Sequence, residues 1–247
     1  MPQTKRNGYE EYKSFHIPRS IFFDIDENSR KDTSLPHMLI DQISWDTIVS
    51  NMGIQKNDQI VIYDNSDVLS SCRGWFNFIY YGHDPKLVNV LNGGLRKWLK
   101  EKKKVTDEIS KIHISDYKST ERKDLVKSKK AIDQNIEEKK FTLIDARSRE
   151  RFEGKIPEPR KGLRSGCIKN SFCIPFNNCL NDDKTFKNKD ELQKIFKTSL
   201  KNLKQENIVF SCGSGVTACV LALAYSLIND KYLPCIYDGS WAEYGLI

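Results

Sequence analysis

Ile208-Val-Phe-Ser-Cys-Gly-Ser-Gly-Val-Thr217 joins a short apolar run to the start of a longer one through a small polar loop. The β-branched and aromatic residues at 208–211 predict a buried strand, and Ala218 to Asn229 predicts a helix. The glycines after the cysteine let the backbone curl with its N–H groups pointing inward. Cys212 would then lie beside a helix N-terminus, which favours a thiolate. The stretch indicates a nucleophilic cysteine, although a buried cysteine before an ordinary turn fits the same residues.

The same succession of elements occurs twice in this chain of 247 residues. Three landmarks of the second half have counterparts 146 to 151 residues earlier. The pairs are His16–Asp24 with Cys167–Pro175, Ile60–Asp64 with Ile208–Cys212, and Val90–Trp98 with Ile236–Trp241. A drift this small indicates an internal duplication.

Each copy alternates short β-branched runs with longer helical patterns, which favours a parallel sheet with helices packed on it. We therefore expect an α/β fold of two tandem domains, residues 1–105 and 131–247, each a small parallel sheet flanked by helices. The lysine- and glutamate-rich residues 106–130 predict a linker. Phe141–Arg147 reads as the opening strand of the second copy, and its counterpart would fall before residue 1. The first copy should therefore lack its opening strand and be the less stable copy.

The composition excludes several classes of protein. With 38% hydrophobic residues the chain is globular. Its longest apolar stretch, Val216–Ile228, is shorter than the ~20 residues of a membrane-spanning helix, so no membrane contact is expected. The start carries no signal-peptide or transit-peptide pattern, which predicts a cytoplasmic protein. The net charge of +7 comes from lysine clusters with interspersed acids, which predict a solvated surface and not a nucleic acid site.

Seven cysteines, an odd number, predict free thiols and not a disulfide framework. Cys167, Cys173 and Cys179 are too far apart for a local zinc clasp, and only four histidines could assist, so no metal site is expected. These three, with Cys72, Cys219 and Cys235, are interpreted as small buried hydrophobic residues.

Two kinds of enzyme use a cysteine in such a loop. A cysteine phosphatase needs an arginine six residues after the nucleophile to clamp phosphate. Position 218 is alanine, and the residue before Cys212 is serine where a phosphatase has histidine. A loop without a cation suits a smaller cargo, such as a sulfur atom carried on the thiolate as a persulfide.

Over nearly its whole length the chain resembles the tandem rhodanese-domain sulfurtransferases, and among them the branch that uses 3-mercaptopyruvate. In the second copy the resemblance is carried by Cys212-Gly-Ser-Gly-Val-Thr-Ala218, Asp145-Ala-Arg147, Pro157-Glu-Pro-Arg-Lys-Gly162, Ile174-Pro-Phe176 and Tyr237-Asp-Gly-Ser-Trp241. In the first copy it is carried by His16-Ile-Pro18, Phe22-Phe-Asp-Ile-Asp26, His37-Met-Leu39 and Asn92-Gly-Gly-Leu-Arg-Lys-Trp98. The thiosulfate-using branch typically has arginine and lysine where Gly213 and Ser214 stand here.

The resemblance implies which residues catalyse the reaction. Cys212 would form the persulfide, with Ser214 as its hydroxyl partner. Asp26 and His37 of the first copy would polarise Ser214 across the cleft between the domains. Asp64 stands at the nucleophile position of the first copy and cannot form a persulfide, so that copy is expected to be noncatalytic.

The resemblance also implies how the donor binds. Arg151 and Arg160 match the pair that holds the substrate carboxylate and keto group, a task that suits planar, bidentate guanidinium groups. The rest of the substrate-binding loop would be Gly213, Gly215, Val216 and Thr217.

The implied reaction is ping-pong transfer of sulfur from 3-mercaptopyruvate to a thiol acceptor, such as thioredoxin or a small thiol, with release of pyruvate and without a cofactor. The loop is neutral and Arg151 and Arg160 lie outside it, which favours a donor whose charge is remote from its sulfur. Two alternatives stay open, a thiosulfate sulfurtransferase and a catalytically impaired module that binds persulfide or senses redox state.

Overall fold

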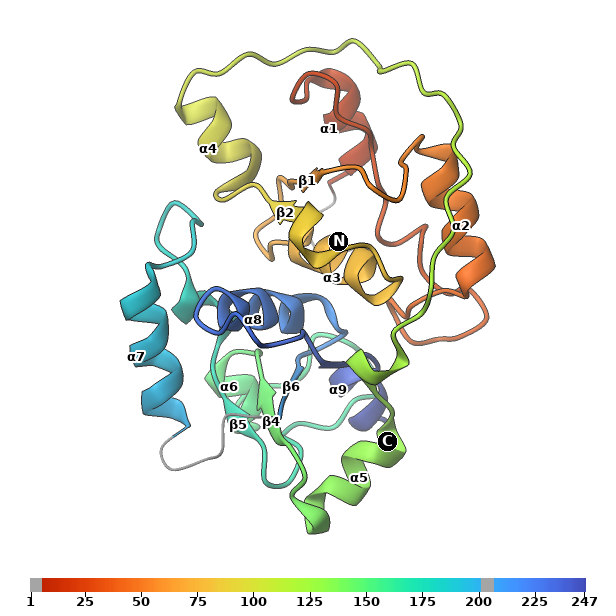
Figure 1. Ribbon diagram of the computed structural model, residues 1–247. Helices are drawn as coiled ribbons and strands as arrows, with labels where there is room; N and C mark the ends of the chain where they lie inside the picture. Colours follow the sequence, from red (N-terminus) through yellow and green to blue (C-terminus); the bar gives the residue numbers. More distant parts are fainter. Residues whose placement is uncertain (1–5, 201–206) are drawn as a thin grey trace.

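Two parallel sheets, one from each half of the chain, organise the molecule (Figure 1). The computed structural model describes residues 6–200 and 207–247. The second half forms a five-stranded sheet of order β3-β7-β6-β4-β5, and the first half a two-stranded sheet, β1-β2. All the strand pairings within these sheets are parallel. The expected α/β fold with a duplicated, helix-flanked parallel sheet is therefore confirmed.

The second unit contributes all five strands of its sheet. Its strands are β3 (Val126–Lys127), β4 (Thr142–Asp145), β5 (Phe172–Cys173), β6 (Ile208–Ser211) and β7 (Ile236–Tyr237). Its helices are α5 (Lys129–Glu138), α6 (Arg149–Phe152), α7 (Lys189–Ser199), α8 (Val216–Ser226) and α9 (Ser240–Tyr244). All four residues of β6 are buried, as expected for a central strand covered on both faces.

In the described residues, the first unit has no strand that corresponds to β4. It consists of α1 (Gly8–Ser14), α2 (Gln42–Asn51), β1 (Ile60–Ile62), α3 (Ser71–Tyr80), β2 (Val88–Val90) and α4 (Gly94–Lys100). Val61 of β1 is 58% exposed, whereas Val209, its counterpart in β6, is 2% exposed. Val209 packs in a cluster with Ile132 of α5 and Leu143 of β4, and the first unit has no equivalent of either element in the described residues.

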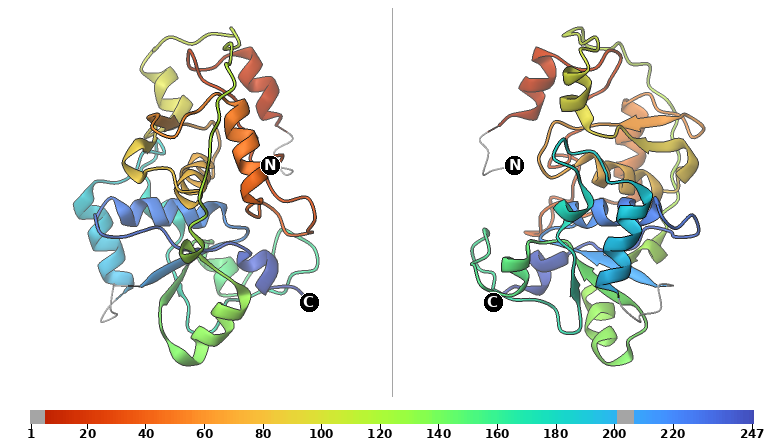
Figure 2. Two further views of the ribbon diagram at one scale, coloured as in Figure 1. Left: turned by 45° about the vertical axis from the view of Figure 1, so that its right-hand side comes forward. Right: turned by 90° about the vertical axis from the view of Figure 1, so that its left-hand side faces the viewer.

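The two units share one apolar core through α3 and α8. These helices lie side by side between the sheets in Figures 1 and 2. Nine residues of α8 are buried, because one side of the helix faces its own sheet and the other faces α3. A single hydrophobic cluster includes Phe76 and Ile79 of α3 together with Leu221 of α8.

The segment expected to be a linker contacts the rest of the protein along much of its length. It runs from α4 over the outside of the molecule to β3 (Figure 2). Thr106 pairs with His16, and the hydroxyl of Tyr117, a residue only 1% exposed, lies 3.0 Å from His83 Nδ1. Val126 and Lys127 form β3, which pairs with β7, so the end of the expected linker contributes a strand to the second sheet.

Two details differ from the sequence expectations. Helix α8 begins at Val216, two residues before the predicted start, and ends at Ser226. Cys167 is exposed and Cys235 is half-buried, so their interpretation as buried residues was wrong. Cys167 lies in a surface loop between α6 and β5. All seven cysteines are free, and Cys72, Cys173, Cys179 and Cys219 are buried as predicted. None of the helices within the described ranges is long and apolar enough to cross a membrane.

The exposure of β1 yields a test by hydrogen exchange. We expect the amides of Ile60–Ile62 to exchange at least about tenfold faster than those of Ile208–Ser211, because the first sheet has fewer strands and less apolar cover. Mass-spectrometric exchange on peptides that contain β1 and β6 measures both in one sample. Equal protection of the two strands would contradict this account of the missing strand.

Candidate active site

The loop after β6, residues 212–215, holds Cys212 between a strand and a helix. Gly215 is the residue before α8, with φ +77°. The backbone N–H groups of Cys212 and Gly215 both donate to the Ser240 hydroxyl, each at 3.1 Å. The first residue of α9 therefore holds both ends of the loop, and Cys212 itself is only 2% exposed.

Arginine side chains approach both glycines of this loop closely. A Cβ on Gly215 would lie 2.8 Å from Arg73 Nη1, and one on Gly213 would lie 3.1 Å from Arg151 Nη2 and 3.7 Å from Arg160 Nη1. The guanidinium groups of Arg151 and Arg160 therefore lie directly over the loop, although both residues are outside it in sequence. Of the other residues implied in binding, Val216 is buried and Thr217 half-buried in the first turn of α8.

Asp26, His37 and Ser214 form a continuous chain of contacts across the two units. His37 Nδ1 lies 3.0 Å from Ser214 Oγ, and His37 Nε2 lies 2.9 Å from Asp26 Oδ1. The structure thus brings together side chains that are 177 positions apart in sequence. His37 adopts φ +61°, a left-handed conformation that residues with a Cβ rarely take.

The surroundings of His37 favour its neutral form. Burial lowers the pKa of His37 most strongly, the charges of Arg73 and Arg160 lower it further, and Asp26 opposes them. A neutral imidazole that donates from Nε2 to Asp26 leaves Nδ1 as an acceptor for the Ser214 hydroxyl. Ser214 can therefore pass a proton to His37.

The two arginines over the loop differ in their partners. Arg151 donates to Glu158 from Nη2 at 2.6 Å and from Nε at 3.2 Å. Arg160 donates to Ser214 Oγ at 3.3 Å and contacts no carboxylate within the described ranges. Since Glu158 neutralises one guanidinium, the groups above the loop carry a net charge of about +1.

Glu158 is a residue that the sequence interpretation did not assign. Its side chain is 1% exposed and also accepts from Arg147 Nη1 at 2.8 Å. Arg147 in turn is paired with Asp145 at 2.7 Å and lies over the Trp241 ring at 4.3 Å. The signal available in the sequence was the position of Asp145 and Arg147 immediately after a buried strand, together with a glutamate two residues before Arg160.

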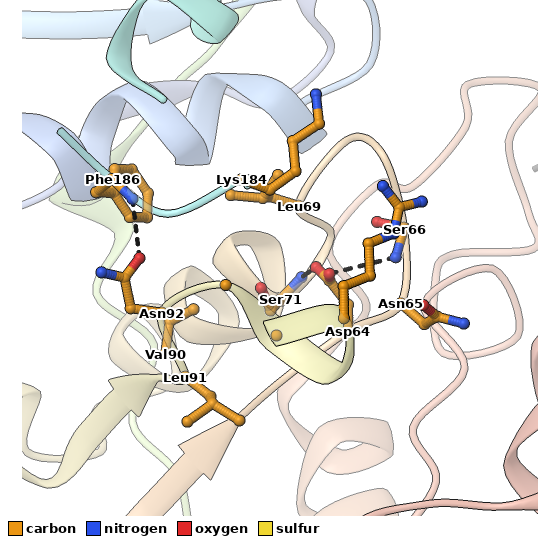
Figure 3. Close-up of a pocket in the computed structure, with 13 residues that line it drawn as sticks. Asp64, Asn65, Ser66, Leu69, Ser71, Val90, Leu91, Asn92, Lys184 and Phe186 are labelled. Atoms are coloured by element: carbon orange, nitrogen blue, oxygen red, sulfur yellow. Dashed lines mark hydrogen bonds between the residues drawn. The ribbon is translucent and has the colours of Figure 1, made fainter. Parts of the chain in front are cut away.

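The corresponding loop of the first unit contains Asp64 in place of the cysteine (Figure 3). Asp64 Oδ2 accepts from the Ser71 N–H at the start of α3 at 2.6 Å, and burial raises the pKa of Asp64. Lys184 and Phe186 of the second unit line the small pocket beside it. The Asp64 side chain occupies this helix N-terminus, so the loop has no thiol at the position of Cys212.

No group of three or more His, Cys, Asp and Glu side chains that could hold a metal ion occurs in the part of the chain that the structure describes. The site consists of a thiol, a hydroxyl, a neutral imidazole and guanidinium groups. This set can attack a soft electrophile, move one proton and bind one small anion.

Comparison with known proteins places this site in a family. Residues 6–101 and 128–246 match the rhodanese-like domain. Rat thiosulfate sulfurtransferase is 38% identical, covering 97% of this chain and 80% of its own. Human 3-mercaptopyruvate sulfurtransferase is 33% identical, covering 99% and 82%. The crystal structure of SseA from Escherichia coli, described with the 3-mercaptopyruvate sulfotransferases, superposes with a TM-score of 0.84 at 28% identity, covering 97% of this chain and 88% of SseA.

The crowding at Gly215 generates a prediction with an internal control. Gly215→Ala should lower the free energy of unfolding by about 3 kcal/mol, because it adds a clash to the strain of φ +77°. Gly162 has the same φ and nothing within 4 Å of its Cβ position, so Gly162→Ala should cost only about 1 kcal/mol. Denaturant unfolding measures both, and equal losses would contradict the close packing of Arg73 on the loop.

Proposed function

The chain belongs to the rhodanese family and is a sulfurtransferase with two rhodanese-like domains in tandem, and from this premise we propose that 3-mercaptopyruvate is its preferred sulfur donor. The relatives named for thiosulfate and for 3-mercaptopyruvate are similar to this chain to nearly the same degree, so overall identity does not choose the donor. The choice depends on the groups above Cys212.

The observation that carries the proposal is the pairing of Arg151 with Glu158. It leaves Arg160 as the guanidinium whose charge is available to a ligand. 3-Mercaptopyruvate brings one carboxylate, whereas thiosulfate brings two negative charges on a compact head. A site with a net charge of about +1 matches the first donor and leaves one charge of the second without a partner, which is costly in a buried site.

In the first step, the Cys212 thiolate attacks the sulfur of the donor thiol. The new S–S bond forms as the donor C–S bond breaks, and the electron pair moves into the enolate of pyruvate. Ser214, through neutral His37, accepts the proton of the donor thiol and returns it to the methylene carbon. Pyruvate leaves, and Cys212 carries the persulfide.

In the second step, an acceptor thiolate attacks the outer sulfur of the persulfide, and Cys212 leaves as the thiolate. A small thiol, thioredoxin or cyanide meets the chemical requirement, since each is a soft nucleophile. Both steps use only groups of this chain and its substrates, so the proposed reaction needs no metal or organic cofactor.

Thiosulfate sulfurtransferase is the second candidate. It is favoured by the position of two guanidinium groups directly over Gly213, close to the thiol. A binding module without turnover is a weaker candidate, because the contacts between Asp26, His37 and Ser214 are in place.

The persulfide intermediate can be weighed directly. After incubation with 3-mercaptopyruvate and removal of excess donor, the intact protein should gain the mass of about one sulfur atom, and cyanide should remove it. Cys212→Ser should gain nothing, and Cys167→Ser, which removes an exposed thiol elsewhere, should behave as the wild type. A gain of mass in Cys212→Ser would place the sulfur on another cysteine.

The preference between the two donors tests the net charge of the groups above the loop. Wild type should favour 3-mercaptopyruvate over thiosulfate by at least about a hundredfold in kcat/KM. Glu158→Gln leaves Arg151, like Arg160, without a carboxylate partner above the loop. The ratio of kcat/KM for the two donors should therefore move toward thiosulfate by about tenfold. Glu153→Gln removes a carboxylate whose ion pairs are with Lys155 and Arg149, and it should leave the ratio unchanged. Equal use of both donors by the wild type would end the assignment.

A further inference from the structure

A buried ion pair that the proposed chemistry does not use connects the two units beside the loop. Arg73 in α3 and Asp238 after β7 approach to 2.7 Å between Nη1 and Oδ1. Their side chains are 1% and 5% exposed. Arg73 belongs to α3 of the first unit, and Asp238 directly follows β7 of the second unit.

The pair contacts the backbone on both sides of the His37–Ser214 contact. Arg73 donates from Nη2 to the carbonyl of His37 at 2.8 Å and from Nη1 to the carbonyl of Gly215 at 3.2 Å. Asp238 Oδ2 accepts from the Leu39 N–H at 3.0 Å. One ion pair therefore holds the segment that carries His37 and the loop that carries Ser214.

Regular secondary structure does not hold His37. It lies between α1 and α2 in residues 15–41, where the structure assigns no helix or extended strand. Its φ of +61° is one that residues with a Cβ rarely adopt, so the surrounding contacts must impose it. The His37 carbonyl and the Leu39 N–H both bond to the ion pair, and the Met38 carbonyl between them accepts from the Arg30 N–H at 3.0 Å.

We propose that Arg73 and Asp238 are positioning residues that set the contact between His37 and Ser214, so that the proton relay exists only when the two units are docked. The inference rests on the proposed function, because it assigns a cause to the geometry of that relay. It makes the relay depend on the interface, since one partner of the pair comes from each unit.

Because Arg73 and Asp238 are charged, substituting either one should shift the pKa of His37, which a change in packing alone would not do. The groups that act on His37 are Asp26, which raises its pKa, and Arg73 and Arg160, which lower it. Arg73→Met removes a cation near His37, so its pKa should rise and the acid limb of the kcat profile should move to higher pH. Asp238→Asn leaves Arg73 without its counter-ion, so the pKa of His37 should fall and the limb should move to lower pH.

The experiment measures kcat and KM against pH for wild type, Arg73→Met, Asp238→Asn and Arg73→Lys. We expect kcat to fall at least about tenfold in the first two variants with KM changed less than about threefold, because Arg160 still binds the carboxylate. Arg73→Lys keeps the charge and should keep the wild-type acid limb. Arg96→Met breaks an exposed pair with Asp67 in the same unit and should match the wild type throughout.

A second measurement does not depend on turnover. The chain has four histidines, so the imidazole signals of His37 can be assigned by NMR with His37→Gln and titrated in each variant. Opposite shifts of the His37 pKa in Arg73→Met and Asp238→Asn support the proposal, and the equally neutral Arg73→Gln replaces Arg73→Met if the latter does not fold. Unchanged titration and kcat in folded variants would overturn it. Failure of wild type to form a persulfide on Cys212 would instead refute the proposed function.

Discussion

The packing of α3 on α8 is the contact on which both the fold and the site depend. A two-stranded sheet does not hold a domain together by itself, and the described part of the first unit has only β1 and β2. Its buried aromatic residues, Phe76 among them, complete their core against α8 of the second unit. The interface that completes this core is also the one that carries His37 to Ser214.

The fold could be predicted from the sequence because the duplication repeats each landmark with almost the same spacing. The loop at Cys212 and the strand before it followed from local pattern alone. The sequence did not predict that residues 101–122 lie against the rest of the protein. The residues that attach this segment, such as Tyr117 and Thr106, are scattered among lysines, and their partners are distant in sequence. A lysine-rich composition predicts solvent exposure of side chains and says little about where the backbone lies.

The residues of the candidate site also fall into two groups, those that the sequence indicated and those that only the structure identified. Resemblance supplied Cys212, Ser214, His37, Asp26 and the two arginines, and the structure brings them together. It did not supply Glu158, Arg73 or Asp238, because a buried ion pair between distant residues leaves no periodic pattern. These unassigned charges decide the net charge over the loop and the position of the imidazole. The charges that do the chemistry were recognisable in the sequence, whereas those that tune it required the fold.

The two copies place different acidic side chains at the same structural position. Asp64 puts a carboxyl group against the N–H of Ser71 at the start of α3, where it accepts a hydrogen bond at 2.6 Å. In the second copy a thiol stands at that position, followed by glycines whose bare backbone admits Arg151, Arg160 and Arg73 to within contact distance. A carboxylate fills its helix N-terminus and has nothing to exchange there. A thiolate can give up its electron pair to sulfur and recover it, and only the copy whose anion is a nucleophile needs cations from outside the loop to hold a substrate. On the proposed function, the divergence of one loop position accounts for a first unit that delivers His37 and a second unit that carries the reacting thiol.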